Sequence, residues 1–366
     1  MDIQNSTEWD SDQLHKEMKD IIQLAKRYAT YPKLKYWCDL SACLVVGWGS
    51  LIALYSSDRL WIKAAFFIIA AFALYRAVVF THELVHLDKK QLPYFRAFWS
   101  LFCGIPLLIP HFLYRDVHRI HHLKGAYNTT KDPEYMFFCG KKSRIILFYF
   151  ENLLPPFLLL ARFLILPVSI LIGGEFRKKI CTDASTMGPK LVFKRPLVTN
   201  AAERKYWLYE EIATCLYVWA VILLIIAHKL PASIIAVWGL LIFTILTLNT
   251  VRFMGATHLY NGKGNEMSLQ EHFKDSVNIL NNSILTNLLA PVGQTKHGLH
   301  HIVPFVPGLR LSELHQEIVR TLPENMLYKQ MNYRSILDVL KIIWRGEPCQ
   351  NNSSNELYAE QKFSTS

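Results

Sequence analysis

The sequence lacks the patterns that would indicate several common classes of protein. None of its seven cysteines forms a CxxC pair, so neither a zinc ribbon nor a disulfide framework is indicated. It contains no recognisable haem-binding, flavin or dinucleotide fingerprint. The first 36 residues are polar and charged, so no cleavable signal peptide is predicted. Charged residues make up only 19% of the chain, whereas hydrophobic residues make up 51%.

Four long apolar runs carry much of this hydrophobic content. The first two have about the twenty residues needed to cross a hydrocarbon core about 30 Å thick. The four runs are Trp37 to Tyr55, Leu60 to Phe80, Ile212 to Ala227 and Pro231 to Val251. Short connectors, Ser56 to Arg59 and His228 to Leu230, join the members of each pair. The sequence therefore predicts an all-α integral membrane protein with four transmembrane helices in two hairpins.

Two further stretches are apolar but contain residues that break helices. Phe95 to Tyr114 includes Gly104, Pro106 and Pro110, which are incompatible with one straight helix. Ile145 to Gly174 includes three prolines and Glu151. We expect both stretches to be embedded in the membrane without spanning it.

Lysine and arginine are unevenly distributed around the predicted spans. With two hairpins, residues 1–36, 82–143, 175–206 and all that follow Arg252 share one face, which carries nearly all forty basic residues. The opposite connectors contain only Arg59 and Lys229. The positive-inside rule makes the shared face cytoplasmic. The net charge of +11 then reflects topology and anionic lipid, and no nucleic-acid partner is indicated.

These features predict three parts along the chain. We expect residues 1–36 to form a cytoplasmic N-terminal segment and residues 37–325 to form the membrane domain with a cytoplasmic helical cap. Residues 326–366 should form a C-terminal helical segment followed by a disordered tail from Glu347, which is rich in Asn and Ser.

Nine of the fourteen histidines lie beside these apolar segments, and eight of the nine are packed into three five-residue boxes. The boxes are His82-Glu83-Leu84-Val85-His86, His118-Arg119-Ile120-His121-His122 and His297-Gly298-Leu299-His300-His301, and the ninth histidine is His258. Residues three and four apart share one face of a helix, so each box can direct its imidazoles at one centre. Nine ligands exceed the capacity of one ion and suit two. An all-nitrogen set favours iron, copper, nickel or zinc.

Other interpretations of the histidines are less favoured. The first box also matches HExxH, which predicts an intramembrane zinc protease with Glu83 as general base. That interpretation leaves the two HxxHH boxes unexplained. A metal sensor or transporter should carry ionisable groups within its spans, and these are almost absent. We expect His15, His228, His272 and His315 to be surface or structural residues, and His111 to be a weak candidate for the site.

The boxes and their surroundings resemble the membrane-bound fatty acid desaturase and hydroxylase superfamily. The similarity includes THELVHL from Thr81, HRIHHLKGAYNTTKDPE from His118 and PVGQTKHGLHH from Pro291, and it covers roughly residues 40 to 325. The sequence around the boxes is similar to that of bacterial fatty-acid desaturase-like proteins. We therefore expect the protein to lie in a bacterial inner membrane rather than in the endoplasmic reticulum. The resemblance implies two iron ions, O2 as co-substrate and a lipid or acyl substrate. The iron ligands implied are His82, His86, His118, His121, His122, His258, His297, His300 and His301.

The resemblance also implies partners for the site. Ligating histidines usually donate their second N–H to a carboxylate, and the candidates are Glu83, Asp132, Glu134 and Asp275. Electrons must come from a separate carrier, such as a ferredoxin or a cytochrome b5-type protein. The implied reaction is insertion of a cis double bond into a lipid-linked acyl chain. Hydroxylation of an acyl chain, sphingoid base, alkane or carotenoid is the alternative, because the boxes do not separate the two outcomes.

Two positions depart from particular subtypes. Acyl-CoA desaturases of animals place an asparagine four residues before the isolated histidine, where this chain has Met254. Front-end desaturases begin the third box with glutamine, where this chain has His297. A phospholipid-linked or otherwise lipid-linked chain is therefore the better expectation for the substrate. Arg252, Tyr260 and Asn278 are weaker candidates for the surroundings of the site.

Overall fold

The computed structural model describes residues 11–88, 90–190, 193–196, 198, 200–323 and 326–346. Almost all of its regular structure is helical, as predicted, and the described strands are two residues long. The chain divides into two compact units. Unit 1 contains the described residues of 1–31, 137–140 and 252–366, and unit 2 contains those of 32–136 and 141–251. The tail predicted to be disordered from Glu347 lies outside the described residues.

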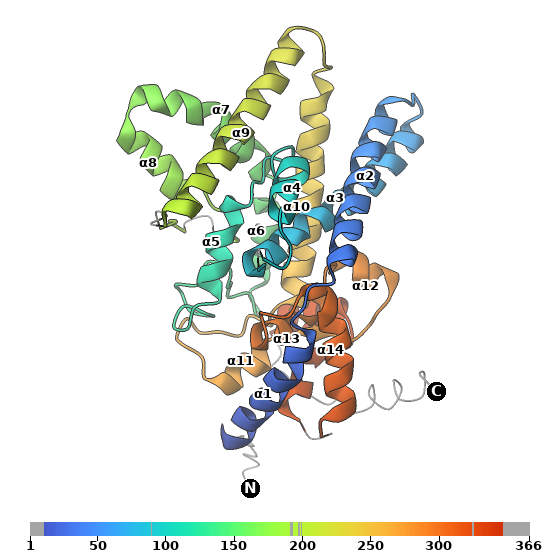
Figure 1. Ribbon diagram of the computed structural model, residues 1–366, viewed down its shortest axis with the longest axis vertical. Helices are drawn as coiled ribbons and strands as arrows, with labels where there is room; N and C mark the ends of the chain where they lie inside the picture. The colour runs from blue at the N-terminus through green and yellow to red at the C-terminus, as the bar shows by residue number, and fades with distance from the viewer. Residues whose placement is uncertain are drawn as a thin grey trace. The chain divides into compact units, whose positions relative to one another are not determined.

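Four helices are long and apolar enough to cross a membrane, as predicted. They are α2 (Lys33–Tyr55), α3 (Leu60–His86), α9 (Ala201–Ile226) and α10 (Ser233–Ala256). Figure 1 shows α2 beside α3 and α9 joined to α10 at one end, which are the two expected hairpins. All four helices present apolar side chains outward, because at most 39% of the most apolar window of each helix is buried. The chain is therefore an all-α integral membrane protein.

Helix α9 begins eleven residues before the apolar run that predicted it. The Asn200 side chain accepts a hydrogen bond from the Glu203 N–H and caps the helix. Glu210 and Glu211 then lie in the helix, where they are 4% and 3% exposed. Each has partners from other elements: Arg162 and Arg177 bind Glu211, and Ser100 donates to Glu210. A buried charge is tolerated when it is paired and hydrogen-bonded, so hydropathy alone placed the beginning of this helix too late in the sequence.

The two proline-containing stretches are broken, as expected. Phe95–Trp99 (α4) passes into a π-helical turn, Ser100–Gly104 (η2), and a new helix, Phe112–His121 (α5), starts after the second proline. The other stretch forms Lys142–Glu151 (α6) and Pro155–Ile172 (α7), which are bent by 44° at the break between them. Gly174–Asp183 (α8) follows α7. Unit 2 thus carries the first and second histidine boxes on α3 and α5.

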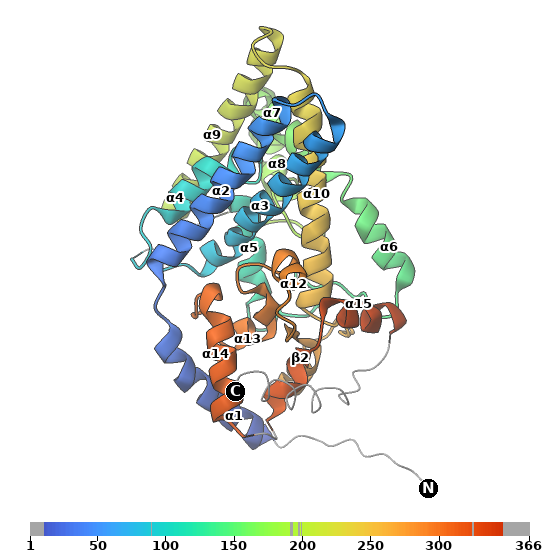
Figure 2. The same ribbon diagram turned by 90° about the vertical axis from the view of Figure 1, so that its right-hand side faces the viewer.

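Unit 1 is built from short helices, several of which share one apolar core. Its main helices are Ser11–Ala25 (α1), Leu269–Asp275 (α11), Ile284–Leu289 (α12), His297–Ile302 (α13), Gly308–Thr321 (α14) and Ile336–Arg345 (α15). Figures 1 and 2 show α1 beside α14, and the buried Ile21, Leu314 and Ile318 belong to their shared core. The 3-10 turns Gln294–Lys296 (η3) and Leu327–Met331 (η4) connect these elements.

A small parallel ladder joins two distant parts of unit 1. Asn278–Ile279 (β1) pairs with Asn332–Tyr333 (β2), and the backbone N–H groups of Leu280 and Asn281 extend the ladder to the carbonyls of Tyr333 and Arg334. Both strands are buried. The ladder therefore fixes the segment before the third histidine box against the C-terminal part of the chain.

Candidate metal centre

The first two histidine boxes meet within unit 2. His82 and His86 end α3, one turn apart, and His118 and His121 lie on α5 with His122 at its C-cap. His82, His118 and His121 are 4% exposed or less. The helical spacing predicted for these boxes is therefore confirmed.

The ring nitrogens of this cluster approach one another closely. His118 Nε2 lies 3.0 Å from His86 Nε2 and 3.1 Å from His122 Nε2. His82, His86 and His118 each offer a ring nitrogen within 4.8 Å of the others. Two nitrogens bound at right angles to one ion, each about 2.1 Å from it, lie about 3.0 Å apart. The donor set therefore fits a transition-metal ion.

Two buried carboxylates orient the second box from the loop that follows it. His118 Nδ1 lies 2.9 Å from Glu134 Oε2, and His121 Nδ1 lies 2.8 Å from Asp132 Oδ2. A carboxylate that accepts the Nδ1–H leaves the lone pair on Nε2 for an ion. Burial alone would lower the pKa of His121, but the Asp132 carboxylate raises it above its ordinary value. Asp132 and Glu134 were both predicted from the sequence to lie beside ligands.

The Glu83 carboxylate accepts a hydrogen bond from a residue of a neighbouring helix. Tyr36 on α2, fully buried, donates its hydroxyl to Glu83 Oε2 over 2.5 Å, and Glu83 Oε1 lies 3.5 Å from His82 Nδ1. The general base of an HExxH protease must reach a metal-bound water. Here one carboxylate oxygen is held by Tyr36 and the other faces the far nitrogen of His82, which is the arrangement of an orienting group.

The third box and His258 meet within unit 1. His297 and His301 lie one turn apart on α13, with their Nε2 atoms 2.9 Å apart. His258, His297 and His301 each offer a ring nitrogen within 4.8 Å of the others. Asp275, 2% exposed, places Oδ2 3.5 Å from His258 Nδ1 and accepts the Asn261 N–H at Oδ1. Each unit therefore holds its own group of three histidines that can bind a metal ion.

Helix α13 is held against β1 by backbone and side-chain hydrogen bonds. The Gly298 N–H donates to the Val277 carbonyl, and the Leu299 N–H donates to Asn278 Oδ1 over 2.9 Å. A Cβ on Gly298 would lie 3.2 Å from the same Asn278 oxygen, so the glycine permits this approach. Lys296, 6% exposed, donates to the Ile279 carbonyl, and burial lowers the pKa of Lys296 to about 8.

Some of the basic residues that the sequence analysis interpreted as a topology signal stabilise the second histidine box and the loop that follows it. Arg195 is 2% exposed and forms an ion pair with Asp116 on α5. The Lys190 ammonium donates to the Thr130 and Asp132 carbonyls, in the loop that carries the orienting carboxylates. The sequence reveals the charges of this segment but not their partners, since these residues are at least 58 positions away in the chain.

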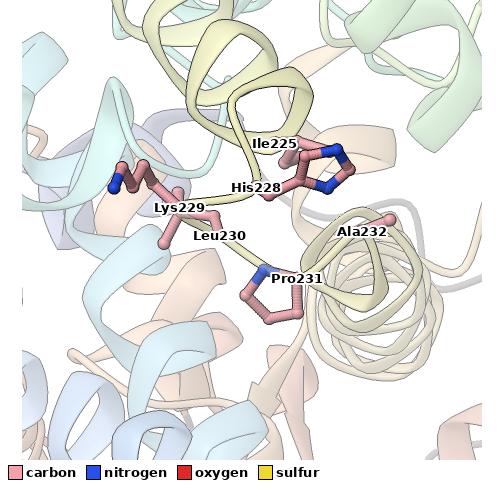
Figure 3. A pocket seen from close by; sticks show the side chains of 6 residues that line it. All are labelled: Ile225, His228, Lys229, Leu230, Pro231 and Ala232. Atoms are coloured by element: carbon pink, nitrogen blue, oxygen red, sulfur yellow. The ribbon is translucent and has the colours of Figure 1, made fainter.

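Three of the four histidines set aside in the sequence, His15, His228 and His315, do not belong to these groups; the fourth, His272 on α11, is close enough to His258 and Asp275 to interact with them electrostatically. His15 is exposed on α1, whereas His315 is buried and 2.7 Å from the Tyr328 hydroxyl. His228 lines a hollow at the connector between α9 and α10, and Figure 3 shows the His228 and Lys229 side chains directed to different sides. No acidic residue or cysteine lines this hollow, so it does not resemble a metal site.

His111 is fully buried and its Nδ1 lies 3.1 Å from Thr81 Oγ1. Its ring also faces the edge of Trp99, with the ring centres 6.2 Å apart. His111 therefore links α3 and α5 beneath the boxes rather than joining the three-histidine group of unit 2.

The membrane helices and clustered imidazoles are those of a membrane oxidoreductase that acts on lipid, and comparison with known proteins supports this class. The family model described as fatty acid desaturase matches residues 59–332, so the chain belongs to the fatty acid desaturase family. The chain is also similar to the ceramide hydroxylase of Caulobacter vibrioides (strain NA1000 / CB15N). The two are 31% identical over 313 residues, which cover 85% of this chain and 88% of that protein. No solved structure matches the chain.

Proposed function

We propose that this chain is an O2-dependent hydroxylase of a ceramide-type lipid. The observation that carries the proposal is the 31% identity to a ceramide hydroxylase along 88% of that protein's length. This relationship favours hydroxylation over the desaturation that the sequence alone put first. A sphingoid or acyl chain held in a ceramide is one of the lipid-linked substrates expected from the sequence.

Desaturation of a lipid-linked acyl chain remains the second candidate. It is favoured by the description of the family, whose model matches residues 59–332. The two reactions share their inputs: O2, two electrons, two protons and an unactivated C–H bond. Hydroxylation leaves one oxygen atom in the product and the other in water, whereas desaturation removes two hydrogens and reduces both oxygens to water.

We propose that the nine histidines hold two iron ions. Unit 2 would supply His82, His86 and His118, and unit 1 would supply His258, His297 and His301. The remaining three ligands would be His121, His122 and His300. Iron bound by these residues supplies the activation of O2. The carboxylates of Asp132 and Glu134 would accept the Nδ1–H groups of His121 and His118, and those of Glu83 and Asp275 lie 3.5 Å from the Nδ1 atoms of His82 and His258, so that the Nε2 atoms would be left for the metal.

Electrons would come from an external ferredoxin or cytochrome b5-type carrier. We infer a site on the cytoplasmic face of a bacterial inner membrane, because the basic residues lie on the side of the spans that carries all three boxes. A basic surface also favours docking of an acidic carrier.

Lipid mass spectrometry of a ceramide-producing host that expresses the chain tests the proposal. Under 18O2, hydroxylation should add one labelled oxygen atom to a ceramide, whereas a loss of two hydrogen atoms would indicate desaturation. His300→Ala is the control and should give neither product. An unchanged ceramide pool together with modified phospholipid acyl chains would overturn the choice of substrate.

A second comparison separates this chemistry from a zinc protease. His121→Ala and His300→Ala should each abolish the product, while Glu83→Gln should keep part of the activity, because the amide retains an acceptor for Tyr36. A protease would show the reverse order, since it depends on the Glu83 carboxylate and not on the two HxxHH boxes.

A further inference from the structure

Helix α15, Ile336–Arg345, is amphipathic: one face is buried, and another carries exposed side chains. Ile336, Val339 and Ile343 are buried, whereas Leu337 is 58% exposed and Trp344 is 40% exposed. The exposed pair is seven residues apart, with the exposed Lys341 between them, so the three lie on one face. A tryptophan and a leucine on the outer face of a short helix require an explanation.

The buried face of α15 is fixed at both ends within unit 1. A Cβ on Gly255 would lie 2.5 Å from the Ile336 side chain and 3.3 Å from the Ile336 carbonyl oxygen, so the backbones of α15 and α10 meet at this glycine. At the other end, the Gly140 N–H donates to the Ile343 carbonyl over 2.8 Å. The exposed face of α15 therefore cannot turn inward.

The contact at Gly255 sets the level of α15 relative to the bilayer. Helix α10 has 24 residues, and at about 1.5 Å per residue it is about 36 Å long, slightly more than a hydrocarbon core of about 30 Å. Gly255 lies in its last turn, so this point is within a few ångströms of the membrane boundary. Figure 2 shows α15 beginning beside the lower end of α10 and running away from it in a crosswise direction.

The residues around α15 have the chemistry of a membrane interface. Arg334, Lys341 and Arg345 are exposed, and the one acid of the helix, Asp338, is bound by the Ser335 hydroxyl. Tryptophan is enriched at the boundary between lipid and water, and each exposed cation near an anionic surface favours binding.

A second short helix reaches the same end of the β1–β2 ladder. The strands are parallel, so the segments leaving them, toward α12 and toward α15, depart in the same direction. In α12, Ile284 is 82% exposed, Leu285 is 61% exposed and Leu288 is 40% exposed. The helices that follow the two strands, α12 and α15, therefore both carry exposed apolar side chains, and the segments that lead to them leave the same end of the ladder.

From these observations we propose that the outer face of α15 lies in the interface of the same bilayer that α10 crosses, in contact with anionic phospholipid. The occupant is lipid because the helix is packed on the end of a membrane span and carries leucine, tryptophan and basic residues together. This contact does not depend on which reaction the enzyme catalyses.

Photo-crosslinking of the full chain in nanodiscs tests the proposal. The probe is phosphatidylglycerol with a diazirine near the head-group end of its acyl chain, diluted in phosphatidylcholine, and adducts are mapped by mass spectrometry. We expect adducts on the tryptic peptides that contain Leu337 and Trp344, as well as on α10, which serves as the internal positive control. Leu337→Glu/Trp344→Glu should reduce the α15 adducts at least tenfold and leave those on α10 unchanged.

The matched control adds the same two charges on the exposed polar face of α14, as Ser312→Glu/Gln316→Glu, and should leave the α15 adducts unchanged. Adducts on α10 without any on α15 would overturn the proposal. Protein–protein crosslinks at Leu337 or Trp344 in place of lipid adducts would also overturn it, because they would assign this face to a second copy of the chain. Equal labelling by a diazirine phosphatidylcholine probe would support the position of α15 in the membrane interface but would overturn its preference for anionic phospholipid.

Discussion

Asp132→Asn is the most informative single substitution at the second box. The Asp132 side chain is fully buried and accepts four hydrogen bonds. Oδ2 accepts from His121 Nδ1 over 2.8 Å and from the Asn128 N–H over 2.8 Å, and Oδ1 accepts from the Glu134 and Tyr135 N–H groups over 2.9 and 3.2 Å. Asparagine has the same shape but turns one of the two oxygens into a donor, so two donors lose their acceptor in either orientation of the amide.

The magnitude follows from those two bonds. A hydrogen bond to a charged group contributes about 1.5–3 kcal/mol, so the loss of two corresponds to about 3–6 kcal/mol. We expect the lower end, about 3 kcal/mol, because the neutral amide is less costly to bury than the carboxylate. Loss of an orienting carboxylate also weakens metal binding by about 10- to 100-fold.

The assay is iron content per chain after a graded chelator challenge, together with thermal unfolding of the metal-free protein in nanodiscs. Asp58→Asn, the same substitution at an exposed position in the α2–α3 connector, is the control and should change neither quantity. Wild-type iron retention and wild-type unfolding temperature in Asp132→Asn would refute the assignment of Asp132 as the group that orients His121.

Three further substitutions test contacts that stabilise the two units. Gly293→Ala should lower the unfolding temperature, because Gly293 has a φ of +78° and a Cβ there would lie 2.1 Å from the Gly308 carbonyl oxygen; a neutral result would contradict this contact. Arg195→Leu should destabilise unit 2 by less than the about 3–5 kcal/mol of a buried charge left without any partner, because Asp116, 14% exposed, keeps its ion pair with Arg115; the double variant with Asp116→Leu should recover part of the loss. Burial lowers the pKa of His315, so the unfolded chain binds the additional proton and stability is lost as the pH falls below about 6.5, by up to about 1.4 kcal/mol per pH unit. His315→Gln should flatten this dependence in thermal unfolding measured from pH 7.5 to pH 5, and an unchanged slope would exclude His315 as the group responsible.

The sequence was sufficient to predict the membrane helices, because their apolar length depends on local composition alone. It was less informative about where these helices begin. Glu210 and Glu211 resemble the end of a span in a hydropathy profile, yet they lie inside α9 because Ser100 and Arg162 reach them from elsewhere in the chain. These two pairings join residues 110 and 49 positions apart and have no local signal.

The histidine boxes were predictable for the same local reason, since spacing on a helix determines which imidazoles share a face. Two of the carboxylates proposed to orient the ligands, Asp132 and Glu134, follow the second box closely in the sequence, and the structure places both beside its histidines. Tyr36 shows the limit of this reasoning. Tyr36 donates to Glu83 from a helix 47 positions away, so only the tertiary structure reveals it, and Asn278, a weak candidate in the sequence, is shown only by the structure to bind the Leu299 N–H on α13.

Unit 1 is assembled from segments that are far apart in the chain, and this determines the order in which its parts become available during synthesis. The unit draws on an N-terminal segment, residues 137–140 and the chain from Arg252 onward. During synthesis, all four membrane helices leave the ribosome before β2 and α15 exist. The support that β1 receives from β2 is therefore added last, after the hairpins can already have entered the bilayer. A nascent or C-terminally shortened chain would have its first two histidine boxes in place and its third without the ladder behind it, so we expect such chains to be targets of membrane quality control rather than partly active enzymes.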